Sequence, residues 1–506
     1  MKVRLLHPER DEPLLASLPT TLGLIVEEDL DLGSIYTAMA DGDAYLGEVA
    51  RKVIQSSLTD PDIIRYRQQV YADIVANLPA VQQVYEIAVG AEQVQRRIFL
   101  GGLMSHHPTT ILSRAVHLLE LLTDDLQALR KVCDQHGGQF KSPAFTQFWA
   151  MVADQLDDDY LARVRAELTE LDMPNGTALS ARLGLGNKGV EYRPHRSTHH
   201  NWWERFTGRD HPGLSFTIDD RDEAGSDALT ELAGRAVNEL ANTATQAADH
   251  IQAFFVRVRC ELGFYLGCHN LQARLGRAGI PTCVPTPVPA RPRQFHCTNL
   301  RDIALCLNSN RQIVGNSVDA DGKALVIITG ANEGGKSTFL RSVGSAQLMM
   351  QAGMFVVAEK FTASVAEGVY THFKREEDAT MTHGKLDEEL ARMSEIADAI
   401  QPDSLLLCNE SFASTTEREG SQIARGIVDT FISASINVVY VTHLFDLADS
   451  LYQRHDPDHL FLRAQRRDDA TRTFRLAEAA PAETSHGLDS FARVFGRSVD
   501  YSAHSR

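Results

Sequence analysis

Apolar residues recur at helical spacing through much of the first half of the chain. The clearest stretch runs from Leu112 to Leu129, where six leucine and valine residues follow one another at steps of three or four positions. A mean step of about 3.5 residues is typical of one apolar stripe along a long packed helix. A second helical pattern spans residues 226–267, and about 40 residues at 1.5 Å each would form a rod on the order of 60 Å long. We therefore predict a mainly α-helical first half.

The pattern changes near residue 300, after a run of prolines between Pro281 and Pro292. Short apolar runs rich in β-branched residues then alternate with helical patterns. The runs that we expect to be strands are 325–329, 355–357, 404–409 and 437–442. Strands separated by helices favour a mostly parallel sheet with helices on its faces. The sequence therefore predicts an α/β domain over residues 301–506.

Residues 141–225 have weak periodicity and many glycines and prolines, which predicts turns or a β-hairpin insertion. The same stretch interleaves tryptophans with positive charges at Lys188, Arg193, Arg196 and Arg205. One interpretation is a surface that contacts the phosphates and bases of DNA. The other is an exposed insertion whose aromatic side chains pack on the helices, and the sequence leaves both open. We expect four domains: a helical core at 1–140, this insertion at 141–225, a long helix and junction at 226–300, and the α/β domain at 301–506.

Bulk composition narrows the class of protein. Of the 506 residues 43% are hydrophobic, yet no apolar run approaches the ~20 residues that a membrane helix needs. The start of the chain lacks the apolar core of a signal peptide, so we expect a cytoplasmic protein with no membrane partner. The seven cysteines are odd in number and include no C-x-x-C pair, which favours reduced, packed thiols over zinc or disulfides.

The formal net charge of −17 argues against a uniformly basic nucleic-acid binder. It does not exclude DNA binding, because the local charge and not the total sets the attraction to phosphates. Any DNA contact would then come from a localised basic patch, or from a dimer that encloses the duplex.

A phosphate-binding loop follows the first expected strand of the α/β domain. Gly330 and the run Gly335-Lys336-Ser337 fit the pattern G-x-x-x-x-G-K-[ST]. Glycines let backbone N–H groups come close to phosphates, and the N-terminus of the following helix attracts negative charge. Lys336 would reach the β- and γ-phosphates, and Ser337 would hold Mg²⁺. The sequence therefore predicts a nucleotide-binding protein.

Two later strands end in candidate catalytic residues. The apolar run 405–408 leads into Asn409-Glu410, the form of a Walker B element. At that place Glu410 can polarise an attacking water as a general base. The run 437–441 ends at Thr442-His443, where the histidine can sense a γ-phosphate. Both features favour an enzyme that hydrolyses ATP.

Several motifs resemble those of the MutS family of DNA mismatch repair ATPases, which are relatives of the ABC ATPases. Residues 328–341 are similar to the family's T-G-P-N-x-G-G-K-S-T-x-x-R, and residues 351–358 to its Q-x-G-x-x-V-P-A. Residues 314–318 resemble the V-P-N-x-[IV] element upstream, and residues 485–487 resemble S-Y-G. Thr442-His443 matches the family's T-H. The C-terminal half carries this resemblance, and the N-terminal half matches more weakly.

The resemblance implies an ABC-type P-loop ATPase domain with a parallel-rich sheet, preceded by a helical core, lever and clamp region. It implies ATP and Mg²⁺ as cofactors, DNA as a partner, a homodimer formed through the ATPase domains, and association with the nucleoid in a bacterial cell. The nucleotide-binding residues that it implies are Gly330, Asn332, Gly334, Gly335, Lys336, Ser337, Thr338 and Asn316, the last beside the base. It implies Mg²⁺ binding by Ser337 and Asn409, and catalytic roles for Glu410 and His443.

The chain departs from the family pattern in three places. No F-x-E wedge occurs near the N-terminus and the core-like pattern begins early, which predicts a shortened member that lacks the mismatch-binding domain. Asn409 stands where the family has Asp, so we expect weaker Mg²⁺ binding and slow hydrolysis. In the family, a loop that crosses the dimer interface carries a Ser. The nearest segment here, residues 382–390, has no Ser at that position. Mismatch recognition by a wedge and activation by the partner subunit therefore stay open.

Three functions compete for this sequence. The first is a MutS-type ATPase whose nucleotide state is coupled to mismatched, branched or distorted DNA in repair or recombination. The second is a nucleotide-switched scaffold that hydrolyses little ATP and makes no DNA contact, which Asn409 and the net charge favour. The third, an ABC transporter subunit, is opposed by the absence of an L-S-G-G-Q loop. The arginine- and tryptophan-rich insertion and the helical rods favour the first.

Overall fold

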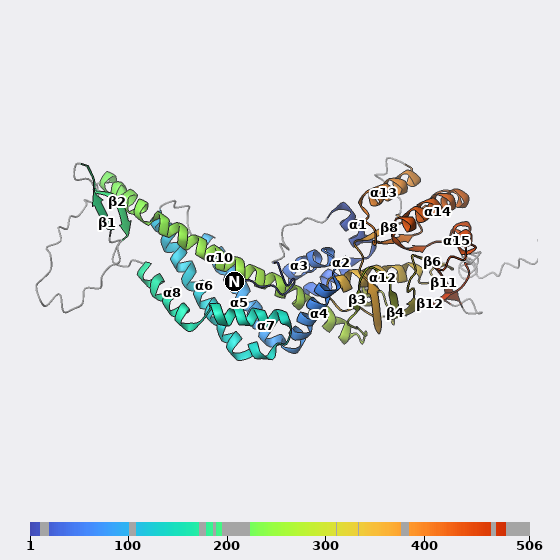
Figure 1. The fold of residues 1–506 in the computed structure, drawn as a ribbon, viewed down its shortest axis with the longest axis horizontal. Coiled ribbons are helices and arrows are strands. Elements are labelled where there is room, and N and C mark those ends of the chain that lie inside the picture. Colours follow the sequence, from blue (N-terminus) through green and yellow to red (C-terminus); the bar gives the residue numbers. More distant parts are fainter. Residues whose placement is uncertain are drawn as a thin grey trace, which may run out of the picture. The chain divides into compact units, whose positions relative to one another are not determined.

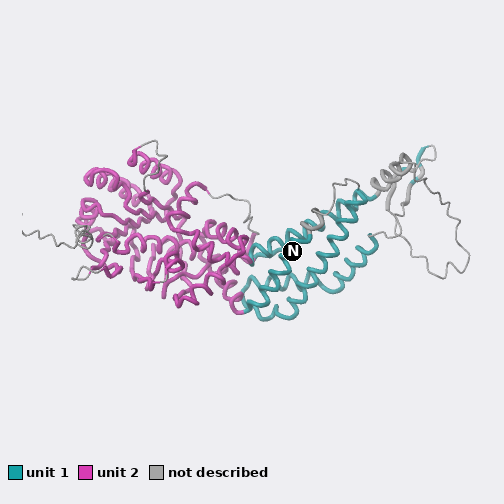
Figure 2. Tube along the Cα trace, turned by 180° about the vertical axis from the view of Figure 1, so that it is seen from behind, with its two compact units in different colours: residues 1–4, 77–262 teal, residues 5–76, 263–506 magenta. Residues whose placement is uncertain are grey.

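The computed structural model describes residues 1–10, 20–100, 108–171, 179–185, 189–194, 223–309, 311–331, 333–375, 384–466 and 472–481. The chain forms two compact units, which Figure 2 colours separately. Unit 1 comprises Met1–Arg4 and Asn77–Leu262, and unit 2 comprises Leu5–Ala76 and Gly263–Arg506. One boundary between them falls inside helix α10 (Glu223–Arg277), so this helix contributes residues to both units.

Unit 1 is mainly helical, as the periodicity of the first half predicts. Its helices are α5 (Leu78–Leu100), α6 (Pro108–His136), the short 3-10 helix η1 (Gly137–Gln139), α7 (Pro143–Gln155), α8 (Asp158–Leu171) and the first part of α10. Helix α6 packs against α5, α7 and α8, and all members of the predicted leucine and valine stripe are buried. Arg259 of α10 forms an ion pair with Glu92 of α5 at 2.5 Å. Within the described ranges, no helix is both long and apolar enough to cross a membrane.

The middle of unit 1 differs from our expectation of an irregular stretch at 141–225. Helices α7 and α8 occupy its first part, and Phe145, Phe148 and Trp149 of α7 are buried against one another. Ser142 is the N-cap residue of α7, and its hydroxyl accepts a hydrogen bond from the backbone N–H of Phe145. The expected hairpin follows as the antiparallel strands β1 (Leu179–Leu183) and β2 (Gly189–Pro194).

Unit 2 is built on a six-stranded sheet with the strand order β12-β11-β6-β10-β9-β8. These strands are β6 (Leu325–Thr329), β8 (Val369–Phe373), β9 (Leu405–Asn409), β10 (Asn437–Val441), β11 (His459–Arg466) and β12 (Arg472–Glu478). All neighbouring pairs are parallel except β11 and β12, which are antiparallel. The alternating pattern therefore predicted the sheet correctly, and β6, β9 and β10 coincide with three of the expected apolar runs.

A second sheet of four strands has the order β3-β7-β4-β5. Its strands are β3 (Thr286–Val288), β4 (Phe295–Leu300), β5 (Asn316–Asp319) and β7 (Lys360–Ser364). The strand expected at residues 355–357 belongs to neither sheet, so that prediction is wrong. Val356 forms an isolated bridge with Cys283 instead. The three side chains of this run are nevertheless buried, so their apolar pattern indicates burial and not a strand.

Helices pack around these sheets (Figure 1). They are α1 (Thr21–Asp29), α2 (Leu32–Ala40), α3 (Ala44–Gln55), α4 (Pro61–Ala76), α11 (Ile303–Asn308), α12 (Lys336–Gln351), α13 (Lys385–Ala399), α14 (Glu417–Ser433), α15 (Phe445–Tyr452) and the end of α10. Helix α1 packs on β8, and α3 and α4 pack on α12. The N-terminal helices thus belong to unit 2, whereas we expected residues 1–140 to form one helical region.

Buried polar contacts join these N-terminal helices to α12. Gln351, fully buried at the end of α12, donates from Nε2 to the carbonyl oxygen of Leu58 at 2.8 Å and to the hydroxyl of Ser57 at 3.0 Å. Arg67 of α4 is 1% exposed and donates from Nη1 to the carbonyl oxygen of Ala352, the C-cap residue of α12, at 3.3 Å. A buried polar group left without a partner costs about 1–3 kcal/mol, so each contact resists separation. Helical periodicity alone does not show such contacts, which explains the shifted boundary.

Helix α12 also comes very close to the core at Gly344. A Cβ atom added to Gly344 would lie 2.6 Å from Cδ1 of Leu407 in β9 and 2.8 Å from Cδ1 of Leu30. Both neighbours are buried side chains, and a tightly packed interior has little room to move them. Glycine therefore permits this approach of the helix to the sheet.

We expect Gly344→Ala to destabilise the protein by about 1–3 kcal/mol, because the added methyl group overpacks the core. Gly426→Ala is the matched control, since Gly426 is an exposed residue of α14 with nothing within 4 Å of an added Cβ. That change should be neutral or stabilising by up to about 1 kcal/mol. Urea unfolding followed by circular dichroism measures both variants, and equal stabilities would contradict the close approach.

One histidine of the sheet, His372 in β8, is completely buried. Burial is the largest cause that lowers the pKa of its imidazole to about 4, and the positive charge of Arg392 adds to it. The ring is therefore neutral in the folded protein at pH 7. In an unfolded chain the pKa is about 6.5, so the unfolded state binds the extra proton between about pH 4 and pH 6.5. The stability that the neutral ring contributes is complete above this window and is lost as the pH falls through it.

Replacing His372 by Gln should remove this part of the pH dependence. The free energy of unfolding of the wild type should exceed that of the variant most at pH 7. The difference should then narrow, by up to about 3 kcal/mol, as the pH falls towards 4. Urea unfolding of both proteins across this pH range measures the difference. A difference that stays constant with pH would show that the ring does not titrate as a buried neutral group.

Candidate functional site

The predicted phosphate loop connects the central strand β6 to helix α12. All residues of β6 are buried, so the strand holds the start of the loop firmly in the sheet. Gly330 has a φ of +112° and Gly335 a φ of +90°, a region that residues with a Cβ atom rarely adopt. The loop then turns directly into α12 at Lys336. Because the first N–H groups of a helix have no partner inside it, the start of α12 offers donors to an anion.

The ammonium group of Lys336 is folded onto this loop. Its Nζ donates to the carbonyl oxygens of Gly330 at 2.8 Å and Ala331 at 3.0 Å. The residue is 5% exposed, and this burial lowers the pKa of its amine, while the nearby carboxylate of Glu410 acts in the opposite direction. Lys336 therefore places a positive charge at the loop, within electrostatic reach of Glu410.

Ser337 and Asn409 meet at the next position of the site. The Ser337 hydroxyl, in the first turn of α12, donates to Oδ1 of Asn409, the last residue of β9, at 2.9 Å. Their oxygen atoms fit a hard cation such as Mg²⁺, which prefers oxygen ligands and retains several waters. The amide adds no negative charge, and in the described part of the chain no group of three Asp, Glu, His or Cys side chains could hold a metal ion. A Mg²⁺ ion here would need further oxygen ligands, such as phosphates.

Glu410 and His443 follow the neighbouring strands β9 and β10. Nδ1 of His443 lies 3.7 Å from Oε1 of Glu410. Contact with His443 is the largest cause that lowers the pKa of Glu410, burial opposes it, and the charges of Lys336 and Lys374 lower it further. Glu410 is therefore an ionised carboxylate at neutral pH, the form that a general base requires.

These groups lie around one cleft of about 910 Å³, a volume that suits a nucleotide. The predicted residues that line it are Asn316, Gly334, Gly335, Lys336, Ser337, Thr338, Glu410 and His443. Three lining residues that sequence reasoning missed are Arg311, Lys374 and Phe474. Lys374 directly follows β8, so the order of the strands would have indicated its place. Phe474 lies on the edge strand β12 and is 46% exposed, and no motif in the sequence indicates its place.

Asn316 lines the cleft at the start of β5, but its side chain is engaged by β12. Its Nδ2 donates to the carbonyl oxygen of Phe474 at 3.2 Å, and its Oδ1 accepts from the backbone N–H of Leu476 at 2.8 Å. The residue is buried. Asn316 therefore joins the four-stranded sheet to β12 and fixes the backbone of Phe474 at the cleft.

An acidic residue stands within the phosphate loop itself. Glu333 forms an ion pair with Arg472 at the start of β12. A carboxylate beside a phosphate site repels the anion, so the guanidinium group offsets that repulsion in part. The Glu333 side chain is mostly exposed, and solvent screens both effects.

Several predicted residues lie outside the described chain. They are Asn332, the DNA-contact candidates Lys188, Arg196 and Arg205, the residues 382–383, and the motif 485–487. Arg193 belongs to β2, of which only the backbone is described at this position. The roles assigned to all of them stay predictions.

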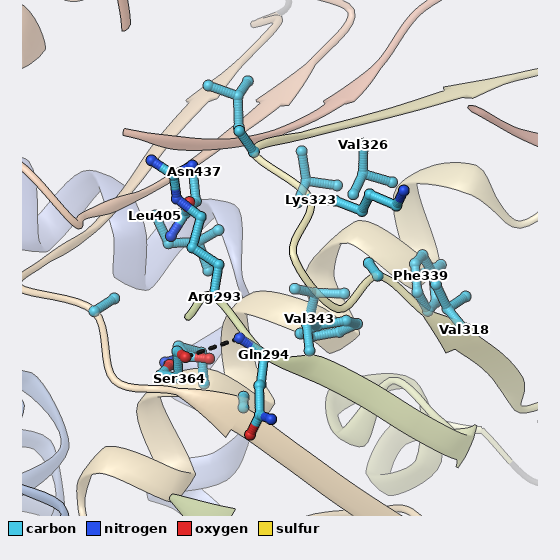
Figure 3. Close-up of a pocket in the computed structure, with 18 residues that line it drawn as sticks. Arg293, Gln294, Val318, Lys323, Val326, Phe339, Val343, Ser364, Leu405 and Asn437 are labelled. Atoms are coloured by element: carbon cyan, nitrogen blue, oxygen red, sulfur yellow. Dashed lines mark hydrogen bonds between the residues drawn. The ribbon is translucent and has the colours of Figure 1, made fainter. Parts of the chain in front are cut away.

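A second cavity, of about 60 Å³, lies between residues of both sheets and α12 (Figure 3). Its lining is largely apolar and includes Val318, Val326, Phe339 and Val343. None of the predicted site residues lines it. The cavity is much smaller than ordinary ligand pockets, so the cleft at the phosphate loop is the candidate site.

Many proteins share part of this sequence, among them the following three relatives. MutS protein homolog 4 of Mus musculus is 24% identical over 189 residues, which are 36% of this chain and 20% of that protein. DNA mismatch repair protein MutS of Leptospira interrogans serogroup Icterohaemorrhagiae is 26% identical over 186 residues, 36% of this chain and 22% of that protein. Endonuclease MutS2 of Streptococcus equi subsp. equi is 29% identical over 147 residues, 28% of this chain and 19% of that protein. The matched segments thus span about a fifth of the length of these relatives.

Two family models match separate parts of the chain. Residues 59–278 match the MutS2 N-terminal domain, and residues 326–497 match MutS domain V. The second match begins within β6 and includes the phosphate loop, Asn409-Glu410 and His443. The first covers the helices from α4 to α10. With a P-loop ATPase domain that follows a helical region, this chain belongs to the MutS family.

Proposed function

We propose that this protein is a MutS-type ATPase that couples ATP binding and hydrolysis to the binding of mismatched, branched or otherwise distorted DNA. The protein would act in DNA repair or recombination. The observation that carries the proposal is the meeting of three groups in one cleft: the phosphate loop after β6, Glu410 after β9 and His443 after β10. The names of the relatives, two of which specify a MutS homologue or DNA mismatch repair, support the DNA substrate.

When bound, ATP would supply the γ-phosphoryl group that passes to water as ADP leaves, and Mg²⁺ would neutralise charge on the phosphate oxygens. The N–H groups of the loop and of the start of α12 hold the phosphates, and Lys336 offsets their charge. Ser337 and Asn409, whose side chains meet beside the loop, would hold Mg²⁺. Glu410 accepts a proton from the attacking water, and His443 orients that carboxylate. The aromatic face of Phe474, exposed in the cleft, is available to the nucleotide base.

We infer an ABC-type arrangement of the ATPase domain, and a homodimer in which a second copy covers each nucleotide cleft. Membership of the MutS family supports both. DNA would contact the helical region, including the insertion at residues 141–225, whose candidate contacts are Lys188, Arg193, Arg196 and Arg205. A protein with this substrate would act in the cytoplasm, at the nucleoid of a bacterial cell.

One observation favours a second function, a nucleotide-switched scaffold without DNA contact. Asn409 gives Ser337 a neutral partner at the metal position. Without a carboxylate, Mg²⁺ binds more weakly and hydrolysis slows, so ATP could serve as a bound signal. The ionised Glu410 in the same cleft favours hydrolysis instead.

The ATPase proposal is tested by the turnover of ATP with no DNA, with duplex, with mismatched duplex and with a four-way junction. We expect slow basal turnover that at least one distorted DNA raises several-fold above matched duplex. Glu410→Gln should keep ATP binding and lose about 10²-fold or more in turnover, because it removes the general base. Lys336→Ala should lose ATP binding. ATP binding without any turnover or response to DNA would establish the scaffold function instead.

The metal role of Asn409 is tested by Asn409→Asp, which adds a negative charge where Mg²⁺ is expected. We expect the variant to reach half-maximal ATP turnover at a Mg²⁺ concentration about ten-fold lower than the wild type, since hard cations favour carboxylate ligands. Asn437→Asp is the control, because Asn437 is the first residue of β10, at the opposite end of the sheet from His443. An unchanged Mg²⁺ requirement in Asn409→Asp would place this residue away from the metal.

A further inference from the structure

A buried polar cluster surrounds the turn that follows Glu410. It consists of His372 in β8, Ser411 in the turn, Tyr440 in β10 and Glu389 in α13. All four are buried, and His372 and Ser411 have no exposed surface. None of them lines the nucleotide cleft. The cluster therefore lies behind the site, where it contacts the backbone that carries the general base.

Ser411, the residue next to Glu410, is held from both flanking strands. Its Oγ lies 2.7 Å from Nδ1 of His372 and 2.7 Å from the carbonyl oxygen of the same residue. On the other side, the hydroxyl of Tyr440 donates to the carbonyl oxygen of Ser411 at 2.8 Å. Strands β8 and β10 are the two neighbours of β9 in the sheet. The residue after Glu410 is thus fixed to both.

The imidazole of His372 extends this contact to helix α13. Its Nε2 lies 3.0 Å from the carbonyl oxygen of Glu389, which can only accept, so Nε2 carries the proton. The single proton of the Ser411 hydroxyl goes to the carbonyl oxygen of His372, and the unprotonated Nδ1 lies 2.7 Å from the same Oγ as a second acceptor. Arg392 strengthens the same junction, because both of its terminal nitrogens donate to the carbonyl oxygen of Phe373 at 3.1 Å. A continuous path of hydrogen bonds therefore runs from α13 through His372 to Ser411.

The turn itself needs such support. Glu410 has a φ of +54° and Phe412 a φ of +62°, left-handed conformations that cost a non-glycine residue of order 1–3 kcal/mol each. Ser411 lies between these two residues. The ring of Phe412 stacks on His372, with centroids 5.4 Å apart, and the Ser414 hydroxyl donates to Oε1 of Glu389 at 3.3 Å. These contacts hold a strained backbone whose conformation sets the direction of the Glu410 side chain.

We propose that His372 and Ser411 are positioning residues for catalysis, which hold Glu410 at the direction needed for general-base action and anchor it to helix α13. The proposal rests on the ATPase function proposed above. Neither residue contacts the nucleotide in this arrangement. Substitution of either side chain should therefore slow the chemical step and leave ATP binding unchanged.

Ser411→Ala tests the proposal, because it removes the bridging hydroxyl and leaves the backbone in place. We expect turnover at saturating ATP to fall about ten-fold or more, while the affinity for ATP changes by less than about two-fold. Ser404→Ala is the matched control. Ser404 precedes the same strand at its other end, is equally buried and has an Oγ without a hydrogen-bond partner. It should leave both quantities unchanged. Full turnover in Ser411→Ala would overturn the proposal.

Combination with Glu410→Gln separates positioning from a general structural effect. A residue that acts through Glu410 has nothing left to position once that carboxylate is gone. The double variant with Ser411→Ala should therefore react as slowly as Glu410→Gln alone, measured in a single turnover. Additive losses would overturn the proposal. Tyr440→Phe removes the hydrogen bond on the other side of Ser411 and should show the same pattern, so the test holds if Ser411→Ala does not fold.

The two proposals fail in different ways. A wild type without turnover, or a Glu410→Gln variant as active as the wild type, would overturn the ATPase function. An active wild type, an inactive Glu410→Gln variant and a fully active Ser411→Ala variant would overturn the positioning role alone.

Discussion

Parallel pairing of β10 with both β6 and β9 is the constraint on which the candidate site depends. In this register Val441 lies beside Ile328 on one side and Asn409 on the other. Because parallel strands point the same way, the phosphate loop, Glu410 and His443 all follow the carboxyl ends of their strands and therefore lie at the same end of the sheet. A slip of one residue would move a strand end by about 3.3 Å and turn its side chains to the opposite face. The burial of β6 on both faces keeps the register fixed.

Polar contacts in the interior add a second level of order. The hydrophobic core of the α/β region fixes where the strands lie, but it does not fix the direction of single side chains at their ends. Hydrogen bonds do that: Asn316 sets the edge strand β12 at the cleft, and Ser411 sets the turn after Glu410. At the far end of α12, Gln351 performs the same task for the N-terminal helices.

The sequence predicted those parts of the fold that depend on local pattern. The stripe from Leu112 to Leu129, the buried strand β6 and the loop at Gly330 could all be read from spacing and residue type. The prediction of strands failed where a buried segment and a paired strand have the same apolar pattern. The run 355–357 has this pattern, and it lies in the core without joining a sheet. Residues such as Phe474 were missed because their place depends on strand order, and strand order arises from contacts between distant parts of the chain.

Helix α10 has a practical consequence for anyone who wishes to study the two units apart. A domain boundary normally lies in an exposed linker, where proteases cut and fragments can be expressed. Here the boundary after Leu262 lies within a helix, and Leu262, Phe264 and Tyr265 around it are all buried. A fragment cut at this point would carry a helix end with unpaired backbone groups and a newly exposed apolar surface. One cut after Leu262 would also divide unit 2, because that unit includes residues 5–76 as well as residues 263–506. Limited proteolysis should therefore spare this junction, and expression of residues 263–506 alone should favour aggregation.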